Sequence, residues 1–143
     1  MIFELNSSIF ISLKNHIKYS NIVELDSNLG NLKVIAYSLL IESAISTESV
    51  DYSTFNGRKI SDYDFVQLII GVNSTDFRAT MIIPTSIFTS TTDNNYYVSC
   101  NSGFTGETFH NVTFKYISDT SVNIKRTLGT LSYAHIVGYK IEL

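Results

Sequence analysis

Apolar and polar residues alternate at every second position through much of the last third of the chain. From 109 to 116 the apolar face is the even-numbered one, and from 121 to 126 Val122 and Ile124 alternate with polar neighbours. A period of two turns one face of a β-strand inward. Residues 133–141 are apolar on both faces, which indicates cover by a second layer or by another subunit. The pattern predicts an all-β chain whose last segment is a strand.

Several earlier segments also have strand character. The stretch 32–41 fits a buried strand or a short helix, and its length favours the strand. Residues 42–56 lose the period, which is typical of a functional or mobile excursion. A turn at 73–76 makes a hairpin of its two flanking strands. The expected strands before residue 109 are 9–13, 17–25, 32–41, 60–72, 77–83 and 96–100.

About eight to ten short strands with regular turns are typical of a sandwich or a jelly roll. We therefore predict one antiparallel, jelly-roll-like β-sandwich domain over residues 1–143, with residues 1–31 as a candidate N-terminal attachment segment. We also expect it to pack as a trimer, for reasons given below.

The composition excludes several partners. Charged residues make up 16% of the chain, whereas there are 19 Ser, 14 Thr and 12 Asn, so small uncharged groups supply most of the surface. A net charge of −3 with only ten Lys and Arg argues against nucleic acid and against an anionic membrane. The start of the chain shows no secretory signal, and no run reaches the roughly 18 apolar residues of a spanning helix. We expect a soluble protein without membrane insertion, made in a reducing cytoplasm.

Catalytic and metal-binding patterns are absent from the sequence. Cys100 is the only cysteine, and the histidines His16, His110 and His135 have no ligand spacing between them. Asp62 and Asp64 flank a tyrosine and would point to the same side of an extended segment, as acid and base or around a cation. Turn capping explains this pair more simply. We therefore expect no enzyme, no metal and no cofactor.

One loop group has the chemistry of a sugar-binding site. Such sites combine planar amide and carboxylate groups with an aromatic face. Core packing is an equally good explanation for most of the aromatic residues. The candidate glycan-binding residues are Asp93, Asn94, Asn95, Tyr96, Tyr97, Phe104 and His110, with Phe109 nearby.

Three segments resemble the C-terminal β-domains of bacteriophage tail fibre and receptor-binding proteins: GRKISDYDFVQLIIG, MIIPTSIF and AHIVGYKIEL. The resemblance lies in a D-Y-D entry to an apolar strand, an I-P strand end and a closing I-x-G-Y-K strand. It spans Gly57–Phe88 and Ala134–Leu143. It implies a β-sandwich homotrimer that is mounted on the virion and binds host surface polysaccharide or protein.

These observations predict a virion structural protein, namely a fibre-tip or receptor-binding module, produced in the bacterial host cytoplasm. For the trimer interface we expect Tyr133, Val137 and Tyr139 of the final strand, because apolar patches rarely stay bare on a monomer. One alternative is a capsid decoration or head-fibre protein that binds other virion subunits. Another is a polysaccharide-cleaving enzyme that uses Asp62 and Asp64.

Overall fold

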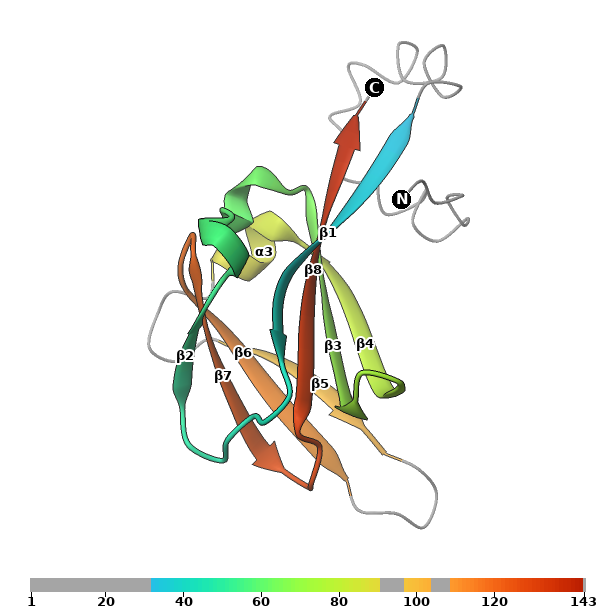
Figure 1. Cartoon of the computed structure of the whole chain (residues 1–143), viewed down its shortest axis with the longest axis vertical. Coiled ribbons are helices and arrows are strands. Elements are labelled where there is room, and N and C mark those ends of the chain that lie inside the picture. Colours follow the sequence, from blue (N-terminus) through green and yellow to red (C-terminus); the bar gives the residue numbers. More distant parts are fainter. Residues whose placement is uncertain (1–31, 91–96, 104–108, 143) are drawn as a thin grey trace. The chain divides into compact units, whose positions relative to one another are not determined.

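The computed structural model describes residues 32–90, 97–103 and 109–142. Two four-stranded antiparallel sheets make up most of this part, so the predicted all-β sandwich is confirmed (Figure 1). The strands expected at 9–13 and 17–25 lie outside the described residues.

Strands from both halves of the sequence pair within each sheet. The first sheet has the order β1-β8-β3-β4 and the second β2-β7-β6-β5, so β8 lies between β1 and β3. The strands are β1 Lys33–Glu42, β2 Val50–Ser53, β3 Phe65–Asn73, β4 Asp76–Pro84, β5 Val98–Ser102, β6 His110–Ser118, β7 Ser121–Leu128 and β8 Tyr133–Glu142. Within the described residues, three short helical segments join them, namely η3 Phe55–Gly57, η4 Ile60–Asp62 and α3 Thr85–Thr89.

The chain divides into two compact units, residues 37–139 and residues 1–36 with 140–143. The described part of the smaller unit is residue 32 with the start of β1 and the end of β8. A single domain over 1–143 stays a prediction, because most of the smaller unit lies outside the described residues.

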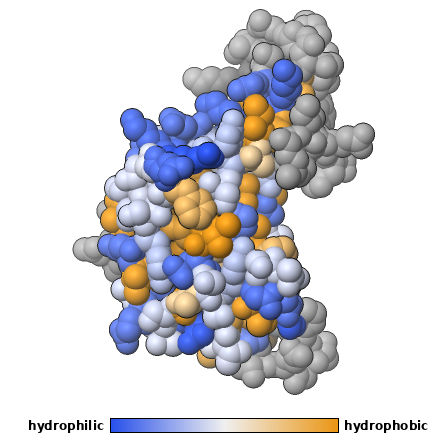
Figure 2. Space-filling view, viewed as in Figure 1, coloured by the Kyte–Doolittle hydropathy of each residue, from blue (hydrophilic) through white to orange (hydrophobic). Residues whose placement is uncertain are grey.

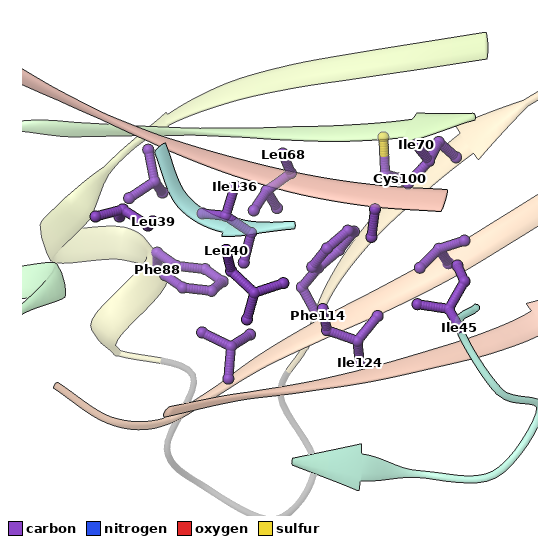
Figure 3. Packing of buried hydrophobic residues seen from close by; sticks show 14 of the residues in the cluster. Leu39, Leu40, Ile45, Leu68, Ile70, Phe88, Cys100, Phe114, Ile124 and Ile136 are labelled. Atoms are coloured by element: carbon purple, nitrogen blue, oxygen red, sulfur yellow. The ribbon is translucent and has the colours of Figure 1, made fainter. Parts of the chain in front are cut away.

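Residues 37–139 contain a hydrophobic core to which both sheets contribute (Figure 3). The inward positions alternate along each strand as the sequence predicted: Val112 and Phe114 on β6 and Val122 and Ile124 on β7 are all fully buried. The first sheet supplies Leu68, Ile70 and Ile136, among others, and Phe88 of α3 packs into the same cluster.

Two sequence expectations need correction. The strand expected over 60–72 begins only at Phe65, because Ile60 enters the core from the short helical turn η4 rather than from a strand face. The excursion 42–56 contains the edge strand β2, in which only four residues are paired. Directly after Pro84 the chain turns into α3, which buries Thr85 and Phe88.

The segment between β2 and β3 is tied to the β6–β7 turn. The backbone N–H groups of Thr54 and Ile60 donate to the carbonyl oxygens of Thr120 and Asp119, at 2.9 and 2.8 Å. The Asp119 carboxylate accepts from the Ser61 hydroxyl at 2.6 Å and from its N–H at 3.1 Å. Hydrogen bonding from Ser61 lowers the pKa of Asp119. These bonds fix a loop that has little regular structure of its own.

Candidate functional site

The residues expected to bind glycan do not form one cluster within the described chain. Asp93, Asn94, Asn95, Tyr96 and Phe104 lie outside the described residues. Tyr97 precedes β5 and His110 begins β6, and in this hairpin Ser102 pairs with His110 while Val98 pairs with Phe114. Five residues of strand therefore separate Tyr97 from His110, which is roughly 16 Å. Tyr97 and His110 belong to opposite ends of the hairpin.

His110 has a structural role in the turn before β8. Its Nδ1 accepts the N–H of Thr130 at 3.1 Å, which leaves the ring proton on Nε2. Gly129 lies against the same ring with φ +83°, and a Cβ at this position would overlap the imidazole. The hydrogen bond and the packing hold His110 in the fold.

The three residues expected in the trimer interface are mostly covered within the chain itself. Tyr133 and Val137 retain only 4% and 9% of their accessible surface. Tyr139 is half-buried, and its hydroxyl donates to Oε1 of Gln67 at 2.5 Å. A partner would therefore contact mainly their neighbours, and the interface assignment itself stays a prediction.

Those neighbours belong to one outward surface of the first sheet, which we call the apolar face. Residues of β3 that alternate with the core residues point outward, and their partners on β8 and β4 share that side. None of the residues in the four cross-strand rows is Lys, Arg, Asp or Glu. The rows are Tyr139–Phe65–Pro84, Val137–Gln67–Ile82, His135–Ile69–Thr80 and Tyr133–Gly71–Phe77.

Exposure on the apolar face is greatest on the edge strand β4. Phe77 is 52% and Ile82 is 45% exposed. The rings of Phe77 and Tyr133 meet with centroids 5.9 Å apart across Gly71, where a Cβ would overlap the carbonyl oxygen of Asp76. Other hydrophobic side chains are exposed away from this face: Ile41 of β1 is 43% exposed. Figure 2 shows hydrophobic side chains in the middle of the surface seen there, over β1.

A few polar side chains on the apolar face form hydrogen bonds between neighbouring strands. The Gln67 side chain accepts from Tyr139 through Oε1 and donates through Nε2 to the Thr80 hydroxyl at 2.8 Å. His135 Nε2 and Ser38 Oγ are hydrogen-bonded at 2.8 Å, and burial lowers the pKa of His135. These groups are neutral at pH 7 and are paired with one another.

The Ser38–His135 distance is one at which a histidine can activate a serine nucleophile. Both residues lie inside hydrogen-bonded neighbouring strands, β1 and β8. Along a strand, successive backbone N–H groups point to opposite sides within the plane of the sheet, so they do not converge on an oxyanion. We therefore read this pair as a cross-strand structural contact.

The contacts of Asp64 and Cys100, the other candidate reactive residues, also point to a role in the fold. The backbone of Asp64 links two elements: its N–H donates to Tyr139, and its carbonyl accepts from Thr85. Burial raises the pKa of Cys100 to about 11, so its thiol stays protonated at neutral pH. Within residues 32–90, 97–103 and 109–142, no three His, Cys, Asp or Glu side chains are grouped as a metal site would require.

The outward surface of the second sheet, which we call the polar face, has the opposite character. It presents Asn, Ser, Thr and Lys side chains between two exposed aromatic rings. Sequence reasoning noticed the alternation of these strands but gave their outward residues no role. The cross-strand rows are Asn101–Asn111–Leu128, Ser99–Thr113–Lys125 and Lys115–Asn123–Asp51, and Leu128 is 51% exposed.

Comparison with protein-family models, with curated proteins and with solved structures gave no match for this chain. None of the helices in the described part is both long and apolar enough to cross a membrane.

Proposed function

We propose that this chain is a non-enzymatic structural module of a bacteriophage virion, namely a tail fibre-tip or receptor-binding module. It self-associates through the apolar face as a homotrimer and turns the polar face toward host surface glycan. The resemblance of Gly57–Phe88 and Ala134–Leu143 to phage receptor-binding domains supports the virion setting and the three-fold assembly. The nested pairing of β1 with β8 and of β2 with β7 supports a jelly-roll-like sandwich.

The observation that carries this proposal is the difference between the two outward faces. The outer side of an antiparallel sheet normally faces water and is polar. The rows of the polar face hold lysine, asparagine and aspartate beside the exposed Leu128, whereas the rows of the apolar face hold no charged residue and present Phe77 and Ile82 around a few paired neutral groups. A neutral surface of this kind meets a second copy of itself without charge repulsion. It is therefore suited to self-association.

The size of the apolar face determines how strongly two copies of the chain should associate through it. Three strands and the seven residues from Phe65 to Gly71 span at most roughly 14 Å by 23 Å. Within this area Phe65, Tyr133 and Val137 are already buried by the chain itself. This area is less than half of the roughly 800 Å² that each partner buries in a standard interface. Assembly through this face alone is therefore concentration-dependent, and further contacts on the particle strengthen it.

Sedimentation velocity of three proteins tests the assembly. Ile82→Lys places a charge in the exposed part of the apolar face, and Thr113→Lys makes a similar change on the polar face. We expect the wild type and Thr113→Lys to associate with rising concentration and Ile82→Lys to remain monomeric. Equal association of all three proteins would show that the chain does not associate through the apolar face.

The virion setting needs a separate test. Mass spectrometry of purified particles of the phage that encodes the chain should find it at a copy number that is a multiple of three. Its absence from particles would refute the virion role. Antibody labelling at the tail tip supports receptor binding, whereas labelling over the head favours the capsid decoration alternative.

The enzyme alternative predicts release of reducing ends from host polysaccharide. That activity would have to disappear in both Asp62→Asn and Asp64→Asn and persist in Ile82→Lys. We expect no release by the wild type.

A further inference from the structure

Two exposed aromatic rings stand at the ends of the β5–β6 hairpin, both on the polar face. Val98, Cys100 and Ser102 point toward the core, so the alternate residue Tyr97 points outward. Phe109 lies opposite Gly103, and its ring covers the position where a Cβ of Gly103 would be. Tyr97 and Phe109 are 60% and 64% exposed. Six residues of strand, about 20 Å, separate the two rings.

Between the rings, the side chains of the polar face hold one another in place. The Asn111 amide donates to Ser99 and Asn101, and its oxygen accepts from the Thr127 hydroxyl. Such cross-linked side chains lose little further entropy when a ligand binds. The face therefore presents a pre-ordered array of amides and hydroxyls.

A second group of hydrogen bonds extends this array toward β2. Asn123 donates to the Asp51 carboxylate at 2.5 Å and accepts from the Ser49 hydroxyl at 2.7 Å. The Asp51 carboxylate is thus engaged by an amide at the edge of the polar face.

The charge of the polar face is locally positive, although the whole chain has a net charge of −3. Lys115 pairs with Asn123, and Lys125 pairs with Thr113, so the two lysines are diagonal neighbours on β6 and β7. Diagonal neighbours lie about 7–8 Å apart. Asp51, two strands from Lys115, is the acidic residue of these rows. This arrangement favours an anionic ligand.

We propose that the polar face binds an extended acidic polysaccharide, which stacks on Tyr97 and Phe109 and pairs its carboxylates with Lys115 and Lys125. Aromatic rings cover the apolar side of sugar rings, and the amides and hydroxyls between them match sugar hydroxyl groups. The distance between the two aromatic rings requires a chain of several sugars. This inference rests on the proposed receptor-binding function and names its ligand class and its contact residues.

The test is a titration of the full chain, followed by amide NMR, with linear hexasaccharides of galacturonic acid, mannuronic acid and sialic acid, and with neutral cellohexaose. We expect at least one acidic hexamer to shift amides of β5, β6 and β7 and to bind more weakly in high salt. Its disaccharide should bind more weakly than the hexamer. Tyr97→Ala and Phe109→Ala should each weaken binding about two- to tenfold, because each removes one stacking ring.

Phe55→Ala is the matched control, because it removes an exposed aromatic ring from η3, outside the cross-strand rows of both faces. Its affinity should equal that of the wild type. No shift on the polar face with any acidic hexamer at millimolar concentration would overturn the inference, as would equal affinity of all three alanine variants. Equal binding of cellohexaose would overturn the acidic ligand class. Because assembly is measured separately with Ile82→Lys, failure here is distinguishable from failure of the proposed function.

Discussion

Truncation of Phe114 tests whether the two sheets share one core. The Phe114 side chain is fully buried, and Figure 3 shows it within the core cluster. Phe114→Ala removes the buried ring and leaves a cavity, which costs about 3–5 kcal/mol. For a domain of this size the melting temperature should fall by roughly 6–20 °C. The loss is a large part of a typical unfolding free energy of about 5–15 kcal/mol.

Phe109→Ala is the matched control, because it makes the same chemical change on the same hairpin at a residue that is 64% exposed. Its cost should be about 0.5 kcal/mol or less, as for most surface changes. Urea unfolding followed by circular dichroism and tyrosine fluorescence measures both variants, since the chain has no Trp. Equal destabilisation by the two substitutions would refute the two-layer arrangement.

Three further substitutions test local features. Asp119→Ala should cost about 0.5–1 kcal/mol at pH 7 through its exposed hydrogen bonds, and the difference should vanish as pH falls through the lowered pKa. Persistence of that difference in acid would contradict the assignment. Gly129→Ala should cost about 1–3 kcal/mol, and more than Gly57→Ala, because φ is positive at both sites but only Gly129 lies against a ring. Equal losses in urea unfolding would disprove the ring contact. Burial lowers the pKa of His135, so between its ordinary pKa and the lowered pKa the unfolded chain binds more protons than the folded chain. The free energy of unfolding should therefore decrease as the pH is lowered through this window. His135→Gln should make the free energy of unfolding depend less on pH in this window. An unchanged pH dependence would mean that another group causes it.

Much of the fold could be predicted, because the alternation of apolar and polar residues within a strand indicates which of its sides is buried. Val122 and Ile124 alternate with polar residues, and the structure turns them inward. The final strand is apolar on both sides, and β8 lies inside a sheet rather than at its edge. The neighbours of β8 could not be predicted, because β1 and β3 are distant in sequence and local periodicity does not encode pairing.

The candidate sites were harder to predict, because proximity in sequence does not give proximity in a hairpin. Tyr97 and His110 are 13 positions apart in the chain, yet β5 and β6 carry them to opposite ends of the hairpin. Conversely, Asn111 and Asn123 share a face only through the pairing of β6 with β7. The outward residues Phe77 and Ile82 looked like ordinary strand positions, and their exposure depends on β4 being an edge strand.

The central claim is that the apolar face is the surface through which copies of this chain meet. Amide NMR spectra of the full chain, compared between dilute and concentrated samples, test it most directly. We predict concentration-dependent shifts in β3, β4 and β8, centred on Phe77 and Ile82, with β5 to β7 unchanged. Shifts confined to the second sheet, or no change up to millimolar concentration, would contradict the claim.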